Sequence, residues 1–243
     1  MTLRFPLLEI ANLDADEVHV WKVRMDLMPL HVPDFWLTLS VDEKSRAEGL
    51  TAKQSERFII GRGALRVLLG EYMQVDPSEL RFRYNSYGKP FLDQKSGRDL
   101  LYFNLSHSES IALFAVTLGR EIGVDIECIR SGLNYNRIAE RFFSPCEAAK
   151  LLAFPKCIQE EAFFSCWTRK EAYVKARGQG LTIPLDRFEV SVAPGEATAL
   201  FNVKEHSKVV PWTIHTFIPN PGYVGSIAIE GHGLKLSHWD GLL

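Results

Sequence analysis

The sequence predicts an α+β protein built from two similar halves, residues 1–120 and 121–243. Helical periodicity is strongest over 42–71 and 160–177, so each half has one principal helix. Runs of β-branched and aromatic residues follow both helices, in an order that the two halves share. No low-complexity tract or flexible linker separates them, so we expect the halves to join near residues 119–123 and to pack tightly.

The first half is expected to open with a strand over 17–25, which is rich in β-branched and aromatic residues. The helix over 42–71 follows, because one helical face collects apolar and small residues. Two turn signals come next, Asp76-Pro77 and the run from Tyr87 to Pro90. The members of the helical face are Phe58, Gly61, Leu65, Leu68 and Tyr72.

Three strands are expected next, over 101–105, 111–118 and 122–129. The connecting residues, 106–110 and 119–121, are few enough to join antiparallel neighbours. We therefore expect these three strands to form a β-meander whose polar groups gather at the turns.

The second half is expected to contain helices over 133–143 and 145–153, and then a longer helix over 160–177 that ends at Gly178 and Gly180. Apolar runs after that helix predict further antiparallel strands. These strands are expected over 188–192, 198–203, 212–217 and 223–229.

The composition has no strong charge bias, with 46% hydrophobic and 24% charged residues and a formal net charge of −2. This excludes a global basic field that would attract nucleic acid, so any anion site must be local. The four cysteines form no CxxC pair and no zinc-like spacing with histidine, which predicts free thiols. Residues 1–12 lack a secretory signal, and no run of about 18 apolar residues predicts a transmembrane helix. We expect a cytoplasmic protein that binds neither nucleic acid nor membrane.

Two carboxylates, Asp125 and Glu127, alternate with apolar residues in the strand expected over 122–129. Residues i and i+2 of a strand point to the same side, so the two carboxylates project together. Two carboxylates at such a short separation repel one another unless a cation lies between them, and magnesium prefers oxygen ligands. The pair therefore predicts a magnesium site, with a solvated acidic face of an edge strand as the alternative.

The helix over 160–177 carries a lysine where its buried stripe should be apolar. Because lysine is rarely buried without a partner, Lys170 either extends to solvent or meets an anion. Glu171 and Lys175 lie on the adjacent edge of the helix, spaced i,i+4. The alternative for them is a surface ion pair worth about 0.2–0.5 kcal/mol. The buried stripe comprises Phe163, Cys166, Trp167, Tyr173 and Val174.

Several polar residues are candidates to contact phosphate groups, although each signal is weak alone. His107 is expected in a serine-rich turn, where the Ser106 hydroxyl and backbone N–H groups could bind an anion. Lys89 lies in a Gly-Lys-Pro turn, and Arg57 and Arg62 lie on the first long helix. The alternative for these residues is an ordinary solvent-exposed charge or an idle turn histidine.

Taken in order along the chain, these motifs resemble the 4'-phosphopantetheinyl transferase superfamily, in its larger, two-half, surfactin-synthetase-activator-like class. The resemblance extends over roughly residues 42–230, and the ordered set is far more specific than any one motif. The matching runs are Tyr87-Gly88-Lys89-Pro90, Phe103-Asn104-Leu105-Ser106-His107-Ser108, Gly123-Val124-Asp125-Ile126-Glu127, Arg141-Phe142-Phe143-Ser144 and the run from Trp167 to Lys175.

The resemblance implies two α+β halves related by pseudo-twofold symmetry, with coenzyme A bound in the cleft between them. It implies that magnesium is held by Asp125, Glu127 and Glu171, and that Asp125, Glu171 and Lys175 are the catalytic residues. Lys175 would reach the pyrophosphate. The other nucleotide or phosphate contacts that it implies are Ser106 and His107 at the 3'-phosphate, Lys89 on the phosphate side, Arg57 and Arg62 near the nucleotide, and Lys170 in support of the acidic site.

The activity that the resemblance implies is transfer of 4'-phosphopantetheine from coenzyme A to a serine of an apo acyl or peptidyl carrier protein. The general base stays open between Glu171 and a water on the metal. Aromatic residues near Arg141 could dock the carrier or be ordinary core residues. We expect a monomer. Two alternatives stay open, a coenzyme A-binding module without catalysis and a magnesium-dependent phosphate-transfer enzyme that modifies no carrier.

Overall fold

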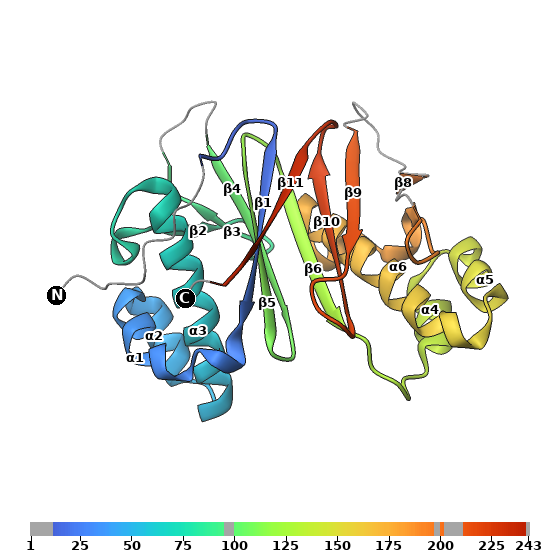
Figure 1. Ribbon diagram of the computed structural model, residues 1–243, viewed down its shortest axis with the longest axis horizontal. Coiled ribbons are helices and arrows are strands. Elements are labelled where there is room, and N and C mark those ends of the chain that lie inside the picture. The colour runs from blue at the N-terminus through green and yellow to red at the C-terminus, as the bar shows by residue number, and fades with distance from the viewer. Residues whose placement is uncertain (1–11, 95–99, 197–199, 202–210, 242–243) are drawn as a thin grey trace.

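The computed structural model describes residues 12–94, 100–196, 200–201 and 211–241, and in Figure 1 its first and second halves lie side by side. The elements of the first half are β1 (Glu17–Arg24), η1 (Met25–Leu27), η2 (Pro29–His31), α1 (Val32–Thr38), α2 (Val41–Glu48), α3 (Ala52–Met73), η3 (Pro77–Glu79), β2 (Phe82–Tyr84), β3 (Pro90–Leu92), β4 (Leu101–Ser108) and β5 (Ile111–Leu118). Those of the second half are β6 (Ile122–Cys128), α4 (Tyr135–Phe142), α5 (Pro145–Ala153), α6 (Lys156–Arg177), η4 (Gly180–Thr182), η5 (Leu185–Arg187), β7 (Glu189–Val190), β8 (Leu200–Phe201), β9 (Trp212–Phe217), β10 (Tyr223–Glu230) and β11 (Lys235–Asp240). The mixed α+β class is confirmed.

The two halves repeat one topology. In the first, β1 precedes the long helix α3 and the hairpin of β4 and β5, and the strand order is β1-β5-β4. In the second, β6 precedes α6 and the pair of β9 and β10, and the order is β6-β10-β9. The pairings within each of these three-strand units are antiparallel. This matching order is the structural basis of the two similar halves.

The sheets pack face to face between the helices, which gives four layers (Figure 1). Alternate residues of β1, β5, β6 and β10 point inward and form a buried apolar cluster between the sheets. The opposite face of the first sheet packs against α3, and α6 covers the second sheet. The inner cluster comprises Val18, Val20, Ile111, Leu113, Ala115, Ile122, Val124, Ile126, Ile227 and Ile229.

The expected β-meander is wrong in its third strand. β4 and β5 form a hairpin, but β6 pairs with β10 in a separate sheet. The free edge of β5 is taken by β1, so no hydrogen-bonding edge remains there for β6. The connection 119–121 therefore carries the chain from one sheet to the other.

The expected turn over 106–110 is also wrong, because β4 continues to Ser108. Ser108 pairs with Ile111, so only Glu109 and Ser110 form the loop, with Glu109 at φ 48°. Ser106 and His107 thus lie on a rigid strand rather than in a turn. This matters for the site, since side chains on a strand have fixed directions.

Other boundaries differ more modestly from the expectation. The segment 42–71 is two helices, because a capping box at Thr51 and Gln54 starts α3 after α2 has ended at Gly49. The helix α6 starts at Lys156, directly after Pro155. Part of the strand expected over 198–203 lies outside the described residues. The structure adds α1, the β2–β3 hairpin and β11, which the sequence patterns did not predict.

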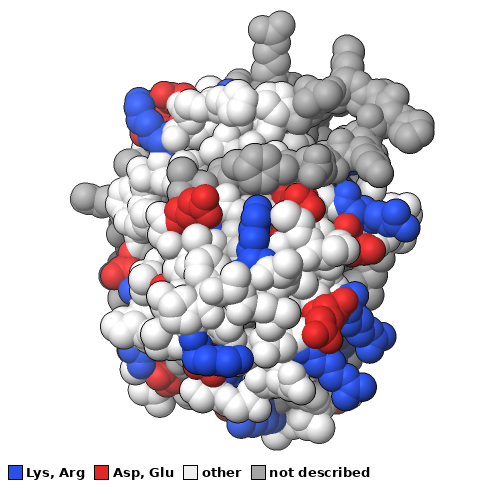
Figure 2. Space-filling view, turned by 90° about the vertical axis from the view of Figure 1, so that its right-hand side faces the viewer, with Lys and Arg blue, Asp and Glu red and all other residues white. Residues whose placement is uncertain are grey.

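The last strand returns to the first half. β11 pairs in parallel with β1, and Trp239 stacks on Trp21 with 5.2 Å between ring centroids. The division at residue 120 consequently stays a proposal. Among the described residues, no helix is long and apolar enough to cross a bilayer. On the face seen in Figure 2, side chains of both charge signs are interspersed, in line with the net charge of −2.

Candidate active site

Two edge strands meet where the halves join, and side chains link them in place of a backbone ladder. The Oδ1 atom of Asn104 in β4 accepts a hydrogen bond of 2.9 Å from the Val124 N–H in β6. The Ser108 hydroxyl accepts one of 3.0 Å from the Cys128 N–H. These links hold β4 in register beside β6, so Ser106 lies opposite Asp125.

The helix α6 packs unusually close to β6 because the strand has a glycine at the contact. A Cβ atom on Gly123 would overlap the carbonyl oxygen of Ala172 and the backbone nitrogen of Ala176. This close approach brings the adjacent, half-buried edge of α6 over the strand. Glu171 and Lys175 thereby reach the polar face of β6.

Asp125 is the centre of the resulting cluster and is only 4% exposed. Its Oδ1 atom accepts hydrogen bonds from the Ser106 hydroxyl at 2.9 Å and from the Lys175 ammonium at 2.6 Å. Its other oxygen, Oδ2, is buried and has no hydrogen-bond partner within the described part of the chain. A buried carboxylate oxygen in this state is costly unless a ligand or ion satisfies it.

Glu127 and Glu171 complete an acidic cluster with Asp125. Burial raises the pKa of Glu171, and the negative charges of Asp125 and Glu127 raise this pKa further. Burial and the charge of Asp125 likewise raise the pKa of Glu127. In both cases Lys175 opposes the shift, and Ser108 also donates a 3.2 Å hydrogen bond to Glu127. Raised carboxyl pKa values in a hollow are typical of functional sites.

Two hollows flank this cluster. One, of about 350 Å³, is lined by Ser106, His107, Asp125, Glu127 and Lys175, among others. His107 is exposed there, so its imidazole can meet a ligand. The other, of about 360 Å³, is lined by Glu171, Lys175 and the turn from Tyr87 to Pro90, together with Asn104, Leu105, Val174, Gly178 and Gly180.

The acidic cluster fits magnesium in its donor chemistry. All three side chains offer carboxylate oxygens, and the buried Asp125 Oδ2 lacks a partner in the described chain. In the described residues, however, no three acidic, histidine or cysteine side chains already form a metal-binding group. The Lys175 ammonium instead lies 2.6 Å from Asp125 Oδ1. Magnesium binding by Asp125, Glu127 and Glu171 therefore stays a prediction.

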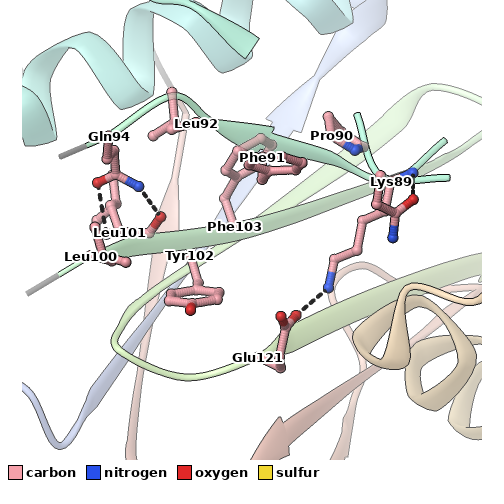
Figure 3. A pocket seen from close by; sticks show the side chains of 11 residues that line it. Lys89, Pro90, Phe91, Leu92, Gln94, Leu100, Leu101, Tyr102, Phe103 and Glu121 are labelled. Atoms are coloured by element: carbon pink, nitrogen blue, oxygen red, sulfur yellow. Dashed lines mark hydrogen bonds and ion pairs between the residues drawn. The ribbon is translucent and has the colours of Figure 1, made fainter. Parts of the chain in front are cut away.

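Lys89 lies at the edge of the site and holds the two halves together, as Figure 3 shows for its contact with Glu121. Its ammonium donates to the Glu121 carboxylate at 2.7 Å and to the carbonyl oxygens of Ala176 at 2.8 Å and Ile122 at 3.2 Å. Asn85, in the same turn, donates 2.6 Å to the Gly178 carbonyl. This turn of the first half thus caps the end of α6, and a phosphate contact by Lys89 stays a prediction.

The two arginines predicted near the nucleotide differ in their surroundings. Arg57 is exposed on α3 and therefore accessible to a ligand. Arg62 forms a 3.3 Å ion pair with the buried Glu43 and stacks on Phe82. Arg66, a third arginine of the same positively charged helical segment, shares Glu43 at 2.6 Å. The contacts of Arg62 tie α3 to α2 and β2, and its role toward a nucleotide is untested.

Lys170 is fully buried and meets an anion, one of the two predicted fates. Its ammonium forms a 2.7 Å ion pair with Glu147 and donates to the carbonyl oxygens of Leu185 at 2.6 Å and Phe188 at 2.7 Å. These contacts anchor α6 to α5 and η5. Glu147 also accepts from the Ser144 N–H, a capping box that the spacing of Ser144 and Glu147 could have revealed.

Sequence reasoning also missed the residues that position the site. Asn104 and Ser108 link β4 to β6, and Gly123 lets α6 approach. The motif that contains Asn104 predicts no role for it, although a polar residue in an apolar strand is a usable signal. A glycine inside a strand is likewise a sign of close backbone approach. For the aromatic pair near Arg141, the structure separates the two residues, since Phe143 is 2% exposed and Phe142 is 36% exposed.

Comparisons with known proteins agree on one family. The family model described as "ACPS: 4'-phosphopantetheinyl transferase superfamily" matches residues 121–228, which include β6 and α6. The chain is 36% identical to the 4'-phosphopantetheinyl transferase HetI of Nostoc sp. over 94% of both chains. It is 33% identical to a putative 4'-phosphopantetheinyl transferase of Synechocystis sp., over 70% of this chain and 68% of that one. It is 31% identical to the transferase Sfp of Bacillus subtilis, over 78% of this chain and 81% of that one.

Proposed function

This chain belongs to the 4'-phosphopantetheinyl transferase superfamily, and from that premise we propose how its site performs the reaction. The chain is an enzyme that transfers 4'-phosphopantetheine from coenzyme A to a carrier protein. The acceptor is a serine hydroxyl of the apo carrier, and the leaving group is adenosine 3',5'-bisphosphate. The roles of the individual residues below are our proposal.

One observation supports the placement of the site. Residues from three elements, β4, β6 and α6, converge on Asp125 at the junction of the halves. The cluster combines three carboxylates with the cation Lys175 and an exposed imidazole at His107. A polyphosphate needs cations and hydrogen-bond donors, and a divalent ion needs oxygen ligands. The junction of the halves offers groups of both kinds.

We propose that Asp125, Glu127 and Glu171 hold a magnesium ion. The raised carboxyl pKa values of Glu127 and Glu171 and the unpartnered Asp125 Oδ2 support this, since a cation between the carboxylates would reduce their repulsion and give Oδ2 a partner. When bound, magnesium supplies Lewis-acid stabilisation of the charge that develops on the pyrophosphate oxygens, a contribution of several kcal/mol.

The protein residues then account for binding and proton transfer. The Lys175 ammonium contacts the pyrophosphate as a point charge. The carrier serine oxygen bonds to the β-phosphorus, and the bond between this phosphorus and the oxygen that leaves with adenosine 3',5'-bisphosphate breaks. Glu171 accepts the serine proton. It is the carboxylate of the cluster that lies on α6 and lines the hollow beside the turn from Tyr87 to Pro90.

Ser106 and His107 are proposed to bind the 3'-phosphate of the nucleotide. Both lie on β4 beside the cluster, and His107 is exposed in the adjoining hollow. Arg57 would contact the nucleotide from α3. For Arg62, Lys89 and Lys170, whose side chains already have protein partners, we propose that they support the site through those partners as well. We further propose that the enzyme acts as a cytoplasmic monomer.

The decisive assay follows the mass of the carrier. Purified protein is incubated with coenzyme A, magnesium and an apo carrier domain, and intact mass is measured. We expect the carrier to gain one phosphopantetheine, and chelator to prevent the gain. Asp125→Asn and Glu171→Gln should abolish it, whereas Asp16→Asn, in an exposed ion pair with Lys235, should leave it unchanged.

The outcome against the proposal is equally definite. Unchanged mass of fatty-acid, polyketide and peptide-synthetase carriers would reject transferase activity. Full activity of Asp125→Asn would reject the acidic cluster as the site while leaving the activity intact. Binding of coenzyme A without any turnover would instead favour a binding module.

A further inference from the structure

The side chain of Lys175 occupies the middle of the acidic cluster. It extends from α6 to β6, where its ammonium lies 2.6 Å from Asp125 Oδ1 and 2.8 Å from the Ser106 hydroxyl. The Ser106 hydroxyl in turn donates to the same Asp125 oxygen at 2.9 Å. The ammonium is thus held by two acceptors, and its side chain is only 29% exposed.

Lys175 also separates the two hollows of the site. It lines both of them, whereas Glu171 lines only the hollow beside Tyr87, and Asp125 and Glu127 line only the hollow beside His107. The side chain therefore stands between the carboxylate of the helix and the two carboxylates of the strand. This is the region where an ion shared by the three acids would lie.

Without a cation, this arrangement of charges would be unfavourable. Three carboxylates in a half-buried site repel one another, and Lys175 is the cation that opposes the repulsion at Glu171, while Ser108, Arg130 and Lys175 oppose it at Glu127. Arg130 offers Glu127 a longer contact of 3.7 Å from the solvent side. Only one oxygen of Asp125 is used, and Oδ2 remains buried without a partner in the described chain.

We propose that the Lys175 ammonium is a resident counter-cation, which holds the acidic cluster together before ligands bind and leaves Asp125 when a divalent cation and the phosphates of coenzyme A enter. The inference rests on the proposed magnesium site. In the ligand-free protein the ammonium takes the place of the ion. In the loaded protein it pairs with substrate phosphate oxygens instead.

Exchange of this kind couples the two ligands. A divalent cation that binds alone must displace the ammonium and leave it without an anionic partner. A phosphate group supplies that partner, so each ligand favours the binding of the other. Such coupling is reciprocal, and factors of about 5–150 are usual. Direct contact between the divalent ion and the pyrophosphate also couples the two ligands, so the exchange is measured as the part of the coupling that Lys175→Met removes.

The test measures Mn²⁺ affinity by electron paramagnetic resonance, with and without coenzyme A, after removal of metals. For the wild-type protein we expect coenzyme A to tighten Mn²⁺ binding at least about fivefold. Lys175→Met should bind Mn²⁺ at least about fivefold more tightly than wild type when coenzyme A is absent, and coenzyme A should tighten its Mn²⁺ binding by a smaller factor than in wild type. Lys175→Arg keeps the charge and should keep the weak metal binding. The matched control is Lys235→Met, which removes a lysine from an exposed ion pair with Asp16 and should match wild type.

Thermal unfolding in chelator gives a second readout. Lys175→Met should unfold at a lower temperature than wild type in chelator and regain the loss with Mn²⁺, because the ion replaces the missing charge. Should this variant fail to fold alone, Lys175→Gln is tested in the same way, and folding of either variant only with Mn²⁺ supports the proposal. Failure of both to fold with Mn²⁺ present overturns it.

The remaining outcomes are separable. Equal Mn²⁺ affinity of wild type and Lys175→Met without coenzyme A, or equal coupling in both, overturns the exchange but leaves the metal site standing. Absence of Mn²⁺ binding in every variant overturns the exchange together with the metal site. Transfer to a carrier, followed by intact mass, then decides independently whether the enzyme activity stands.

Discussion

The backbone of Gly123 lies directly against that of Ala172, so that a side chain at position 123 would overlap the helix. This contact between β6 and α6 sets the distance between the acids of the strand and Glu171 of the helix. The catalytic arrangement accordingly depends on a residue that carries no chemistry of its own. A substitution at position 123 therefore tests the effect of packing on activity without removing any reactive group.

Gly123→Ala is expected to lower the free energy of unfolding by about 1–3 kcal/mol, the usual cost of overpacking a buried contact. Transfer activity should fall further than stability explains, because α6 must move away from β6. Urea unfolding and the carrier mass assay measure the two effects. The matched control is Gly61→Ala in α3, where a Cβ meets only Met25 at 4.0 Å and stability should not decrease. Wild-type activity of Gly123→Ala would contradict the role of this contact.

The acidic cluster predicts a pH-dependent loss of stability in metal-free protein. The pKa of Glu171 is raised above its ordinary value of 4.5, so the folded protein binds this proton more tightly than the unfolded chain does. The contribution of this group to stability is thus present below pH 4.5 and is lost as the pH rises through the folded pKa. Glu171→Gln should therefore be more stable than wild type above that window in chelator, and the difference should vanish at lower pH.

Thermal unfolding of both proteins over a pH series tests this, with and without magnesium. Added magnesium should stabilise wild type above pH 4.5 and should have less effect on Glu171→Gln, which lacks one charged ligand. A stability difference that is constant with pH would show that the Glu171 carboxyl does not titrate abnormally. That result would remove one support for a cation shared by the three carboxylates.

His107→Ala is expected to weaken coenzyme A binding about tenfold, because a charge-assisted hydrogen bond to the 3'-phosphate is worth about 1.5–3 kcal/mol or less where solvent reaches it. Binding of dephospho-coenzyme A, which lacks this phosphate, should be unchanged. Isothermal titration calorimetry measures both affinities. His31→Ala, in η2 of the first half, serves as the control. Equal losses for the two ligands would reject the assignment of His107 to the 3'-phosphate.

Lys170 offers a contrasting case, since its partner is internal. Lys170→Met should destabilise the protein by about 3–5 kcal/mol, because it leaves the Glu147 carboxylate buried without its cation. The double variant with Glu147→Gln should recover part of the loss, since the unpaired charge is then removed. Urea unfolding of the four proteins gives the coupling energy. A small effect of Lys170→Met together with a large loss of coenzyme A affinity would instead place Lys170 at the nucleotide.

Local patterns predicted much of the fold. The expected bounds of β5, α5 and β9 agree with the structure, because each is a short segment with clear periodicity or a clear cap. Strand partners were not predictable in this way. β6 pairs with β10, about a hundred residues later, and β11 returns to β1, and such pairings depend on long-range packing rather than on local sequence.

The same distinction between local pattern and long-range packing applies to the site. Asp125, Glu127, Glu171 and Lys175 were predicted from strand and helix periodicity together with an ordered set of motifs. The contacts that these four side chains make were not predicted. The 2.6 Å contact of Lys175 with Asp125 depends on how closely α6 approaches β6, and the i,i+4 spacing had suggested Glu171 as its partner. Spacing specifies which side chains share a face, whereas the packing of neighbouring elements decides which of them meet.

The turn that carries Lys89 belongs to the first half, yet its acceptors belong to the second. Lys89→Met is expected to lower the free energy of unfolding by about 1–3 kcal/mol, because the carbonyl oxygens of Ala176 and Ile122 and the Glu121 carboxylate lose a shared donor. Hydrogen exchange should rise at the end of α6 before it rises elsewhere. Lys53→Met, at an exposed position of α3, is the matched control and should change neither quantity.

The same variant distinguishes the two roles of Lys89. If Lys89 binds phosphate only, coenzyme A affinity falls and metal-free stability stays at the wild-type value. If it acts as a link between the halves only, stability and exchange change while the affinity measured on folded protein stays the same. We expect both to change, because a ligand phosphate in the adjoining hollow competes with Glu121 for one ammonium. Glu121→Gln removes that competitor and should therefore strengthen coenzyme A binding, and weaker binding by this variant would show that Glu121 does not compete with the ligand.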